Sequence, residues 1–225
     1  MQIKTSAVIV AGGLGKRMGS SLPKQFLLLH GRPVLYYTID AFLQADASMQ
    51  IILVLPEEHL ELGREIVDGF FDASKIQLAA GGETRFHSVQ NGLRLVDDER
   101  IIFVHDGVRC LVRPDLIQRC YTAALETGSA IPVVEVKDSL RIITEDGNES
   151  LDRSKVRLVQ TPQTFHSKIL QSAFAIDYKE RFTDEASVVE AFGLKVTLID
   201  GDPTNIKITT PLDLMVAEKI LEQRN

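Results

Sequence analysis

The sequence predicts an α/β fold built on a doubly wound, mostly parallel sheet. Short apolar, β-branched runs alternate along the chain with segments of helical periodicity, which is typical of βαβ units. The first three apolar runs are continuous rather than alternating, as expected for strands that helices cover on both faces. A strongly charged stretch at residues 135–157 interrupts this pattern. We therefore expect a Rossmann-like sheet with a projecting β-hairpin arm.

Strands and helices alternate from the first apolar run to the end of the chain. Apolar runs rich in valine and isoleucine predict strands at residues 7–10, 51–55, 101–104 and 130–134, and a later strand is expected at 195–199. Pro33 suits the first turn of a helix, and the apolar residues after it recur at helical spacing. Helices are predicted at residues 33–45, 57–71, 84–96, 114–126, 166–178, 185–192 and 211–223.

The arm is predicted from its charge and its turn chemistry. Eleven of the 23 residues from 135 to 157 are charged, so this segment lacks the apolar residues for a core of its own. Asp146-Gly147 is a turn dipeptide between two short runs with partial alternation, which is the pattern of a hairpin. A solvated surface excursion is the alternative.

Composition and charge fit one globular domain over residues 1–225. Apolar residues make up 44% and charged residues 25%, which excludes disorder as the main state. The net charge of −6 argues against binding to nucleic acid or an anionic membrane, and no apolar run approaches the ~20 residues of a membrane span. No signal-peptide pattern precedes the first strand. Cys110 and Cys120 are too few for a disulfide framework and are expected as reduced thiols in a cytoplasmic protein.

A glycine-rich loop, Ala11-Gly12-Gly13-Leu14-Gly15-Lys16-Arg17-Met18-Gly19, follows the first strand. A P-loop would need glycine at Val10, and a dinucleotide fingerprint would need glycine or alanine at Met18, so the sequence excludes both. Three basic side chains accompany the loop instead, which suits a triphosphate whose negative charge must be neutralised as a bond breaks. They are Lys16, Arg17 and Lys24. A tight turn with solvated basic residues is the alternative.

Further short motifs follow this loop along the chain. They are Pro23-Lys24-Gln25, Gly81-Gly82-Glu83-x-Arg85-x-x-Ser88, His105-Asp106-Gly107-Val108-Arg109, Asp152-Arg153, Gln160-Thr161-Pro162-Gln163, Thr183-Asp184-Glu185-Ala186-Ser187 and Asn205-Ile206-Lys207-Ile208-Thr209. In this order they resemble the 2-C-methyl-D-erythritol 4-phosphate cytidylyltransferases of the non-mevalonate isoprenoid pathway. That family belongs to the nucleotidyltransferases that activate sugar and polyol phosphates. The resemblance extends from residue 7 to about residue 215.

The resemblance implies an enzyme that joins CTP and 2-C-methyl-D-erythritol 4-phosphate, with Mg²⁺ as cofactor. The acceptor phosphate would attack the α-phosphate of CTP in line and expel pyrophosphate. Because a phosphate monoester is already mostly ionised at pH 7, this reaction needs no general base. The implied catalytic residues are Arg17, Lys24 and Lys207. The residues implied for CTP binding are Ala11, Gly12, Gly13, Gly15, Gly82, Arg85, Ser88 and Gly107.

Acceptor binding is implied for Asp106, Arg109, Arg153, Thr161 and Thr183. Arg153 is expected to reach the site from the arm of a partner subunit, so the arm would hold together a two-fold homodimer. Asp106 follows a buried strand, and a carboxylate beside a triphosphate is unfavourable unless a cation or a donor lies between them. Mg²⁺ or the polyol hydroxyls would supply that contact. The alternatives are a turn cap at Asp106 and helix-surface side chains at Arg85 and Ser88.

Two departures from the commonest family pattern leave the acceptor open. Gly12 and Val108 also occur in related pentitol-phosphate cytidylyltransferases, so ribitol 5-phosphate is the alternative acceptor. Leu151-Asp152-Arg153-Ser154 looks more like the erythritol enzyme. A non-enzymatic nucleotide sensor on the same fold is a further alternative. Basic residues at both the nucleotide and the acceptor subsites argue against it.

Overall fold

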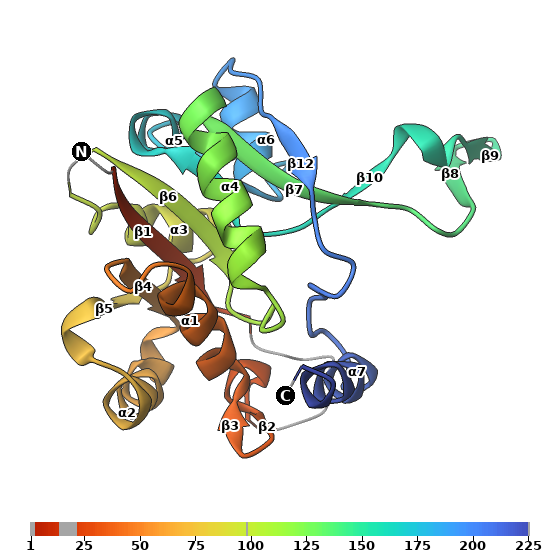
Figure 1. Ribbon diagram of the computed structural model, residues 1–225. Helices are drawn as coiled ribbons and strands as arrows, with labels where there is room; N and C mark the ends of the chain where they lie inside the picture. Colours follow the sequence, from red (N-terminus) through yellow and green to blue (C-terminus); the bar gives the residue numbers. More distant parts are fainter. Residues whose placement is uncertain (1–2, 14–21, 98, 225) are drawn as a thin grey trace.

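The computed structural model describes residues 3–13, 22–97 and 99–224. Its main sheet has the strand order β10-β7-β11-β6-β1-β4-β5, and β12 also pairs with β7 (Figure 1). The central strands β1, β4, β5 and β6 run parallel, whereas β11 lies antiparallel between β6 and β7. The strands are β1 (Lys4–Val10), β4 (Gln50–Leu55), β5 (Ile76–Ala80), β6 (Arg100–Asp106), β7 (Ser129–Glu135), β10 (Arg157–Val159), β11 (Gln163–His166) and β12 (Leu198–Asp200).

Helices cover both faces of this sheet (Figure 1). One layer contains α1 (Val34–Ala45), α2 (Leu60–Phe70) and α4 (Pro114–Thr127), and the other contains α3 (Arg85–Leu93), α5 (Ser167–Ala173) and α6 (Glu185–Ala191). Alternate residues of each central strand face opposite layers, because strand side chains alternate. Ile9 and Leu53 pack in the first layer, and Val8 and Ile52 pack in the second. The predicted doubly wound, mostly parallel α/β fold is confirmed.

Smaller elements complete the described chain. α7 (Pro211–Glu222) packs in a third apolar cluster with Val34, Leu111 and Ile208. The remaining elements are β2 (Leu28–Leu29) and β3 (Arg32–Pro33), with the 3₁₀ turns η2 (Lys24–Phe26), η3 (Glu57–His59), η4 (Ala73–Lys75) and η5 (Arg153–Lys155). Within the described ranges, none of the helices has the length and apolar character needed to cross a membrane.

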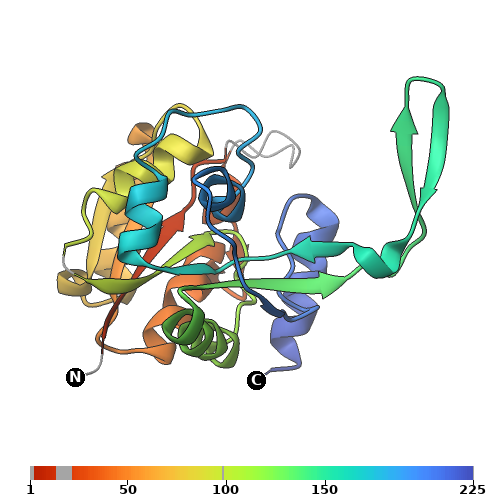
Figure 2. The same cartoon turned by 90° about the horizontal axis from the view of Figure 1, so that it is seen from above.

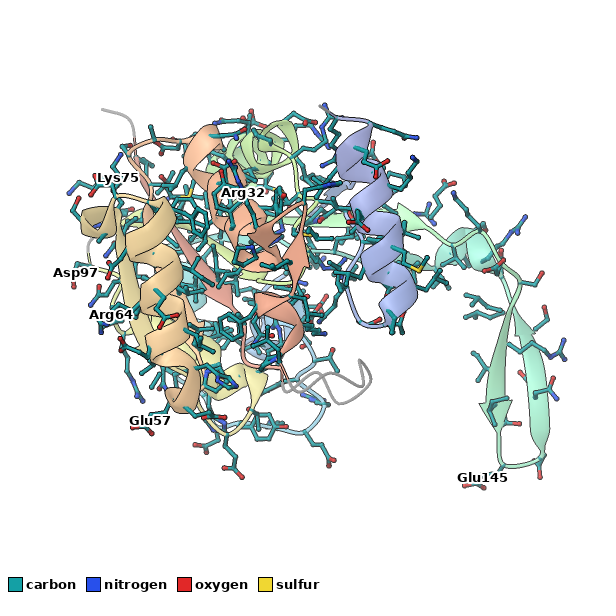
Figure 3. All side chains as sticks on the ribbon, turned by 90° about the horizontal axis from the view of Figure 1, so that it is seen from below. Arg32, Glu57, Arg64, Lys75, Asp97 and Glu145 are labelled. Atoms are coloured by element: carbon teal, nitrogen blue, oxygen red, sulfur yellow. The ribbon has the colours of Figure 1, made fainter. Side chains whose placement is uncertain are left out.

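The predicted hairpin is present and projects from the sheet (Figure 2). β8 (Leu140–Thr144) pairs antiparallel with β9 (Gly147–Leu151), and the stem closes where Glu135 of β7 pairs with Arg157 of β10. Glu145 lies at the far end of the arm (Figure 3). Ile143 is 81% exposed although it is a large apolar side chain. Dimerisation through this arm stays a prediction.

Several predicted elements differ in extent from the observed ones, and three of them are clearly shorter at one end than expected. The helix expected at 84–96 ends at Leu93. The helix expected at 166–178 ends at Ala173, where Phe174 instead stacks on Phe86 of α3 with ring centroids 4.8 Å apart. The strand expected at 195–199 begins only at Leu198, where pairing with β7 starts. Tertiary contacts, rather than local periodicity, set these ends.

Candidate active site

A cavity of about 660 Å³ opens at the carboxyl ends of β1, β5 and β6. The chain leaves β1 toward β4 and β5 on one side and returns to β6 on the other, so the cavity lies at the topological switch point of the sheet. Nine of the residues that the sequence implicated line it. They are Ala11, Gly12, Gly13, Lys24, Gly82, Arg85, Ser88, Asp106 and Lys207.

The loop between β5 and α3 forms one wall from small residues. Ser88 is buried, and its Oγ accepts a hydrogen bond from the Gly82 backbone N–H at 3.1 Å and donates to the Thr84 carbonyl at 3.0 Å. A Cβ on Gly82 would lie 2.4 Å from the Cβ of His87. The close approach of this loop to α3 therefore requires glycine, and Ser88 is part of the wall rather than a helix-surface hydroxyl.

The glycine loop and η2 are joined beside the cavity. Gln25 is buried, and its Nε2 donates to the Ala11 carbonyl at 2.8 Å. Lys24 is also buried, with 9% of its surface exposed, and lines the cavity next to Gly13. The Pro23-Lys24-Gln25 motif thus places a cation at the start of the glycine loop. The predictions for Gly15 and Arg17 lie outside the described residues.

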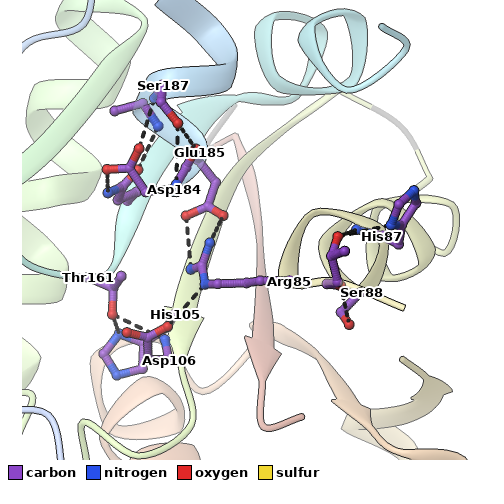
Figure 4. A network of polar contacts seen from close by, with 12 residues as sticks. Arg85, His87, Ser88, His105, Asp106, Thr161, Asp184, Glu185 and Ser187 are labelled. Carbon is purple, nitrogen blue, oxygen red and sulfur yellow. Dashed lines mark hydrogen bonds and ion pairs between the residues drawn. The ribbon is translucent and has the colours of Figure 1, made fainter. Parts of the chain in front are cut away.

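Asp106, the last residue of β6, contacts three cations at the cavity floor, and Figure 4 shows one of them, Arg85. Its Oδ1 lies 3.3 Å from Arg85 Nε, and its Oδ2 lies 3.0 Å from Lys207 Nζ and 3.4 Å from Arg109 Nε. Burial alone would raise the pKa of Asp106, but Arg85, Lys207 and Arg109 together hold this pKa well below the ordinary value for aspartate. The carboxylate is therefore ionised, and the surrounding charge is positive.

Glu185 holds Arg85 from the side opposite to Asp106 (Figure 4). Arg85 Nη1 lies 2.5 Å from Glu185 Oε1, and Nη2 lies 3.2 Å from Oε2, so the contact is bidentate. The Glu185 side chain is 1% exposed. Glu185 is not among the site residues predicted from the sequence, although it lies in the Thr183-Ser187 motif. The sequence indicates that Glu185 lies at the start of a helix, but no local pattern indicates that it is buried against Arg85.

His105 and Thr161 lie beside Asp106 (Figure 4). The Thr161 hydroxyl accepts from the Asp106 backbone N–H at 3.1 Å and lies 3.0 Å from His105 Nδ1. His105 Nε2 lies 3.2 Å from the Arg109 carbonyl, which can only accept, so we assign the imidazole proton to Nε2. The unprotonated Nδ1 then accepts a hydrogen bond from the Thr161 hydroxyl. Burial lowers the pKa of His105 to about 3. His105 is therefore a neutral structural residue.

Arg109 fixes the segment that carries Lys207. Its Nη1 donates to the Asn205 carbonyl at 2.9 Å, and the Asn205 side chain donates to the Thr161 carbonyl at 2.8 Å. The Ile208 backbone N–H donates to the Val108 carbonyl at 3.0 Å. Lys207 thereby reaches the same carboxylate as Arg85 although the two residues are 122 positions apart in the sequence.

The remaining predicted residues do not line the cavity. Gly107 packs against Ala11 and donates its N–H to the Val10 carbonyl at 2.8 Å. Arg153 is exposed in η5 and donates to the Lys137 carbonyl within the arm. Thr183 is exposed before α6. The single proton of the Thr161 hydroxyl already bonds His105, so a bond donated to an acceptor phosphate would have to replace that contact. The ligand roles of these residues stay predictions.

A magnesium ion fits this site only together with phosphate. The described residues contain no group of three or more His, Cys, Asp or Glu side chains that could hold a metal ion. Asp106 offers one carboxylate, and both of its oxygens already contact cations. Mg²⁺ in nucleotide sites is commonly held by one or two carboxylates, substrate phosphates and water. The donor set therefore fits a metal that arrives with a triphosphate.

The family model of 2-C-methyl-D-erythritol 4-phosphate cytidylyltransferase (IspD) matches residues 5–223 of the chain. A protein of this name from Bacteroides thetaiotaomicron is 48% identical over 219 residues, which cover 97% of this chain and 100% of the relative. Another, from Syntrophus aciditrophicus, is 40% identical over 229 residues, which cover 99% of this chain and 98% of the relative.

Solved structures show the same similarity. 4-Diphosphocytidyl-2C-methyl-D-erythritol synthase from Anaerococcus prevotii aligns with a TM-score of 0.84 at 29% identity, over 98% of this chain and 96% of that chain. 2-C-Methyl-D-erythritol 4-phosphate cytidylyltransferase from Thermus thermophilus aligns with a TM-score of 0.76 at 31% identity, over 96% and 98% of the two chains. Sequence and fold are thus similar over nearly the whole length of each chain.

Proposed function

The chain belongs to the 2-C-methyl-D-erythritol 4-phosphate cytidylyltransferase family, and we propose that it carries out this family's reaction in the cavity at the carboxyl ends of β1, β5 and β6. It is a nucleotidyltransferase that joins CTP and 2-C-methyl-D-erythritol 4-phosphate to give 4-diphosphocytidyl-2-C-methyl-D-erythritol and pyrophosphate. Relatives that are 40% and 48% identical carry the name of the erythritol phosphate enzyme, so ribitol 5-phosphate is not favoured as acceptor.

The observation that carries the proposal is the cluster of charges at the cavity floor. Arg85, Arg109 and Lys207 surround the single carboxylate of Asp106, and Lys24 lines the same cavity. The carboxylates of Glu57, Glu58 and Glu83 also line the cavity, and Glu185 pairs with Arg85 behind it. The cations around Asp106 are the groups that would meet phosphate. Such fixed charges stabilise phosphoryl transfer by neutralising the charge that develops on the phosphate oxygens.

In the proposed mechanism the acceptor phosphate oxygen forms a bond to the α-phosphorus of CTP, and the bond to the departing pyrophosphate breaks. Lys24 and Lys207 neutralise the phosphate oxygens, together with Arg17. The wall around Gly82 and Ser88 receives the cytosine. No general base is required, because the acceptor phosphate is already mostly dianionic at pH 7. Mg²⁺, when bound, would lower the charge of the triphosphate, with Asp106 as its protein ligand.

We also propose that residues 1–225 form one domain and that the arm at residues 135–157 joins two copies of the chain. An isolated two-stranded hairpin is marginally stable in water, and the exposed Ile142 and Ile143 give this one apolar surface that a partner would cover. Arg153 at the base of the arm would then reach the acceptor phosphate of the neighbouring subunit. The free, buried cysteines Cys110 and Cys120 fit a cytoplasmic protein.

The proposal is tested by measuring pyrophosphate release with CTP and Mg²⁺ in the presence of 2-C-methyl-D-erythritol 4-phosphate or ribitol 5-phosphate. We expect release with the first acceptor. Lys24→Ala should lower turnover at least ~100-fold, a loss of ~2.7 kcal/mol of transition-state stabilisation, while CTP binding weakens modestly. Lys75→Ala is the control, because it removes a half-exposed lysine that precedes β5, at the amino ends of the strands and away from the cavity. Near-normal turnover of Lys24→Ala would remove Lys24 from the mechanism.

A further inference from the structure

The buried carboxylate of Glu185 has one strong partner in the described chain, Arg85. Burying an ion pair brings little stability, because removing two charges from water costs about as much as their attraction returns. Burial raises the pKa of Glu185, and the nearby Arg85 guanidinium opposes this rise. Replacing a buried ion pair by apolar side chains of similar volume is often neutral or stabilising. The pair therefore calls for an explanation beyond the fold.

The geometry points to the Asp106 side of Arg85. A guanidinium is planar and rigid, so a bidentate contact that holds two of its nitrogens also fixes the direction of the third. Glu185 holds Nη1 and Nη2, and the remaining Nε is directed at Asp106 Oδ1 at 3.3 Å. The other oxygen of Asp106 contacts Lys207 and Arg109. Glu185 thus determines how one edge of the Asp106 carboxylate is held.

The backbone around Glu185 is itself anchored to the sheet. Gln163 of β11 donates to the Asp184 carboxylate at 2.9 Å and accepts from the Ala186 N–H at 2.8 Å. Asp184 caps α6 through a capping box with Ser187. The backbone of Glu185 is therefore held in place, which is required of a residue that positions another side chain.

Aromatic packing joins the same two segments independently. Phe86, the neighbour of Arg85, stacks on Phe174 at 4.8 Å and on Phe182 at 5.8 Å between ring centroids. Phe182 precedes Thr183, for which the family resemblance implies a role in acceptor binding. The first turn of α3 and the start of α6 thus pack as one unit, and the ion pair sits within it.

We propose that Glu185 is a positioning residue for the transfer reaction: its carboxylate fixes the Arg85 guanidinium, and Arg85 in turn fixes Asp106 at the cavity floor. This inference rests on the proposed function. Without Glu185, Arg85 can turn toward the triphosphate and bind it in the ground state, which does not help the transition state. Loss of Glu185 should therefore lower kcat while leaving the KM for CTP unchanged or lower.

The test compares Glu185→Met, Arg85→Met and the double variant, with Glu190→Met as control for an exposed glutamate on the same helix. We expect kcat to fall roughly 30-fold in E185M and roughly 100-fold in R85M, and the double variant to match R85M instead of showing the product of the two losses. Unfolding midpoints should fall in E185M, which leaves Arg85 without its carboxylate, and recover in the double variant, while activity does not recover. Glu185→Gln replaces E185M if that variant does not fold.

Several outcomes would overturn the inference. They are a folded E185M with the kcat of E190M, a double variant whose losses multiply, or a double variant that regains activity together with its unfolding midpoint. The affinity for CTP, measured by calorimetry, gives a second readout, which we expect to stay equal or tighten in E185M. Weaker CTP binding in E185M would contradict the inference even without turnover. Silence of the wild-type protein toward 2-C-methyl-D-erythritol 4-phosphate would instead contradict the proposed function.

Discussion

Replacing Thr161 by valine removes one hydroxyl and leaves the shape of the side chain nearly unchanged. That hydroxyl accepts from the Asp106 N–H at 3.1 Å and bonds His105 Nδ1 at 3.0 Å, and all three residues are buried. The variant leaves both groups without a partner, and each buried polar group left unpaired costs about 1–3 kcal/mol. We therefore expect a loss of about 2–6 kcal/mol in the free energy of unfolding.

At about 2–4 °C per kcal/mol for a chain of this size, the unfolding midpoint should fall by roughly 4–24 °C. Thr164→Val is a closely matched control in the same segment. Thr164 is fully buried, and its hydroxyl has no hydrogen bond of normal geometry within the described residues, with only the weakly polar Cys120 thiol beside it. Urea and thermal unfolding of both variants measure the difference. Equal stability of T161V and T164V would refute the reasoning.

Three further predictions follow from the arm, the cytosine wall and the cap of α7. Mixing Arg153→Ala and Lys24→Ala subunits should restore part of the activity if the arm serves the neighbouring site, and no recovery would count against sharing. Gly82→Ala should raise the KM for CTP at least ~10-fold because its Cβ meets His87 at 2.4 Å, whereas Gly69→Ala, which meets nothing within 4 Å, should not. Burial would raise the pKa of Asp213, but hydrogen bonds from Thr209 and Thr210 lower it below the ordinary value. This contribution to stability is therefore present above the unfolded-state pKa of ~3.9 and lost as pH falls through the folded-state pKa. Asp213→Asn should cost about 1 kcal/mol at pH 7, and chemical unfolding from pH 7 to 2 should show this difference shrinking.

The strands and the cavity were predictable because their signals are local. Continuous apolar runs such as residues 51–55 can only be strands or buried helices, and their short length selects strands. Residues that follow parallel strands meet at one edge of the sheet. The sequence therefore predicts that Asp106 and the glycine loop lie close together. Charge and the Asp146-Gly147 turn were enough to predict the arm.

Long-range contacts decided what the sequence left open. β11 lies in the middle of the sheet, but it carries buried polar residues such as Gln163 and Thr164. The sequence of this strand therefore lacks the apolar pattern that would predict it. The sequence allows Arg85 to be either a nucleotide ligand or a surface cation. In the structure, an ion pair with Glu185, 100 residues away in the chain, holds Arg85 at the cavity floor. Pairings over such distances depend on the packed fold and have no local signature.

The central claim is a single in-line displacement at the α-phosphorus of CTP, carried out by fixed charges without a covalent intermediate on the protein. The most direct test uses CTP that carries sulfur on the α-phosphorus in one known configuration, with 2-C-methyl-D-erythritol 4-phosphate as acceptor. The configuration at phosphorus in the product is then determined by phosphorus NMR. We predict inversion, since one displacement inverts the centre once. Retention would mean two displacements through a bond to the protein and would contradict the account.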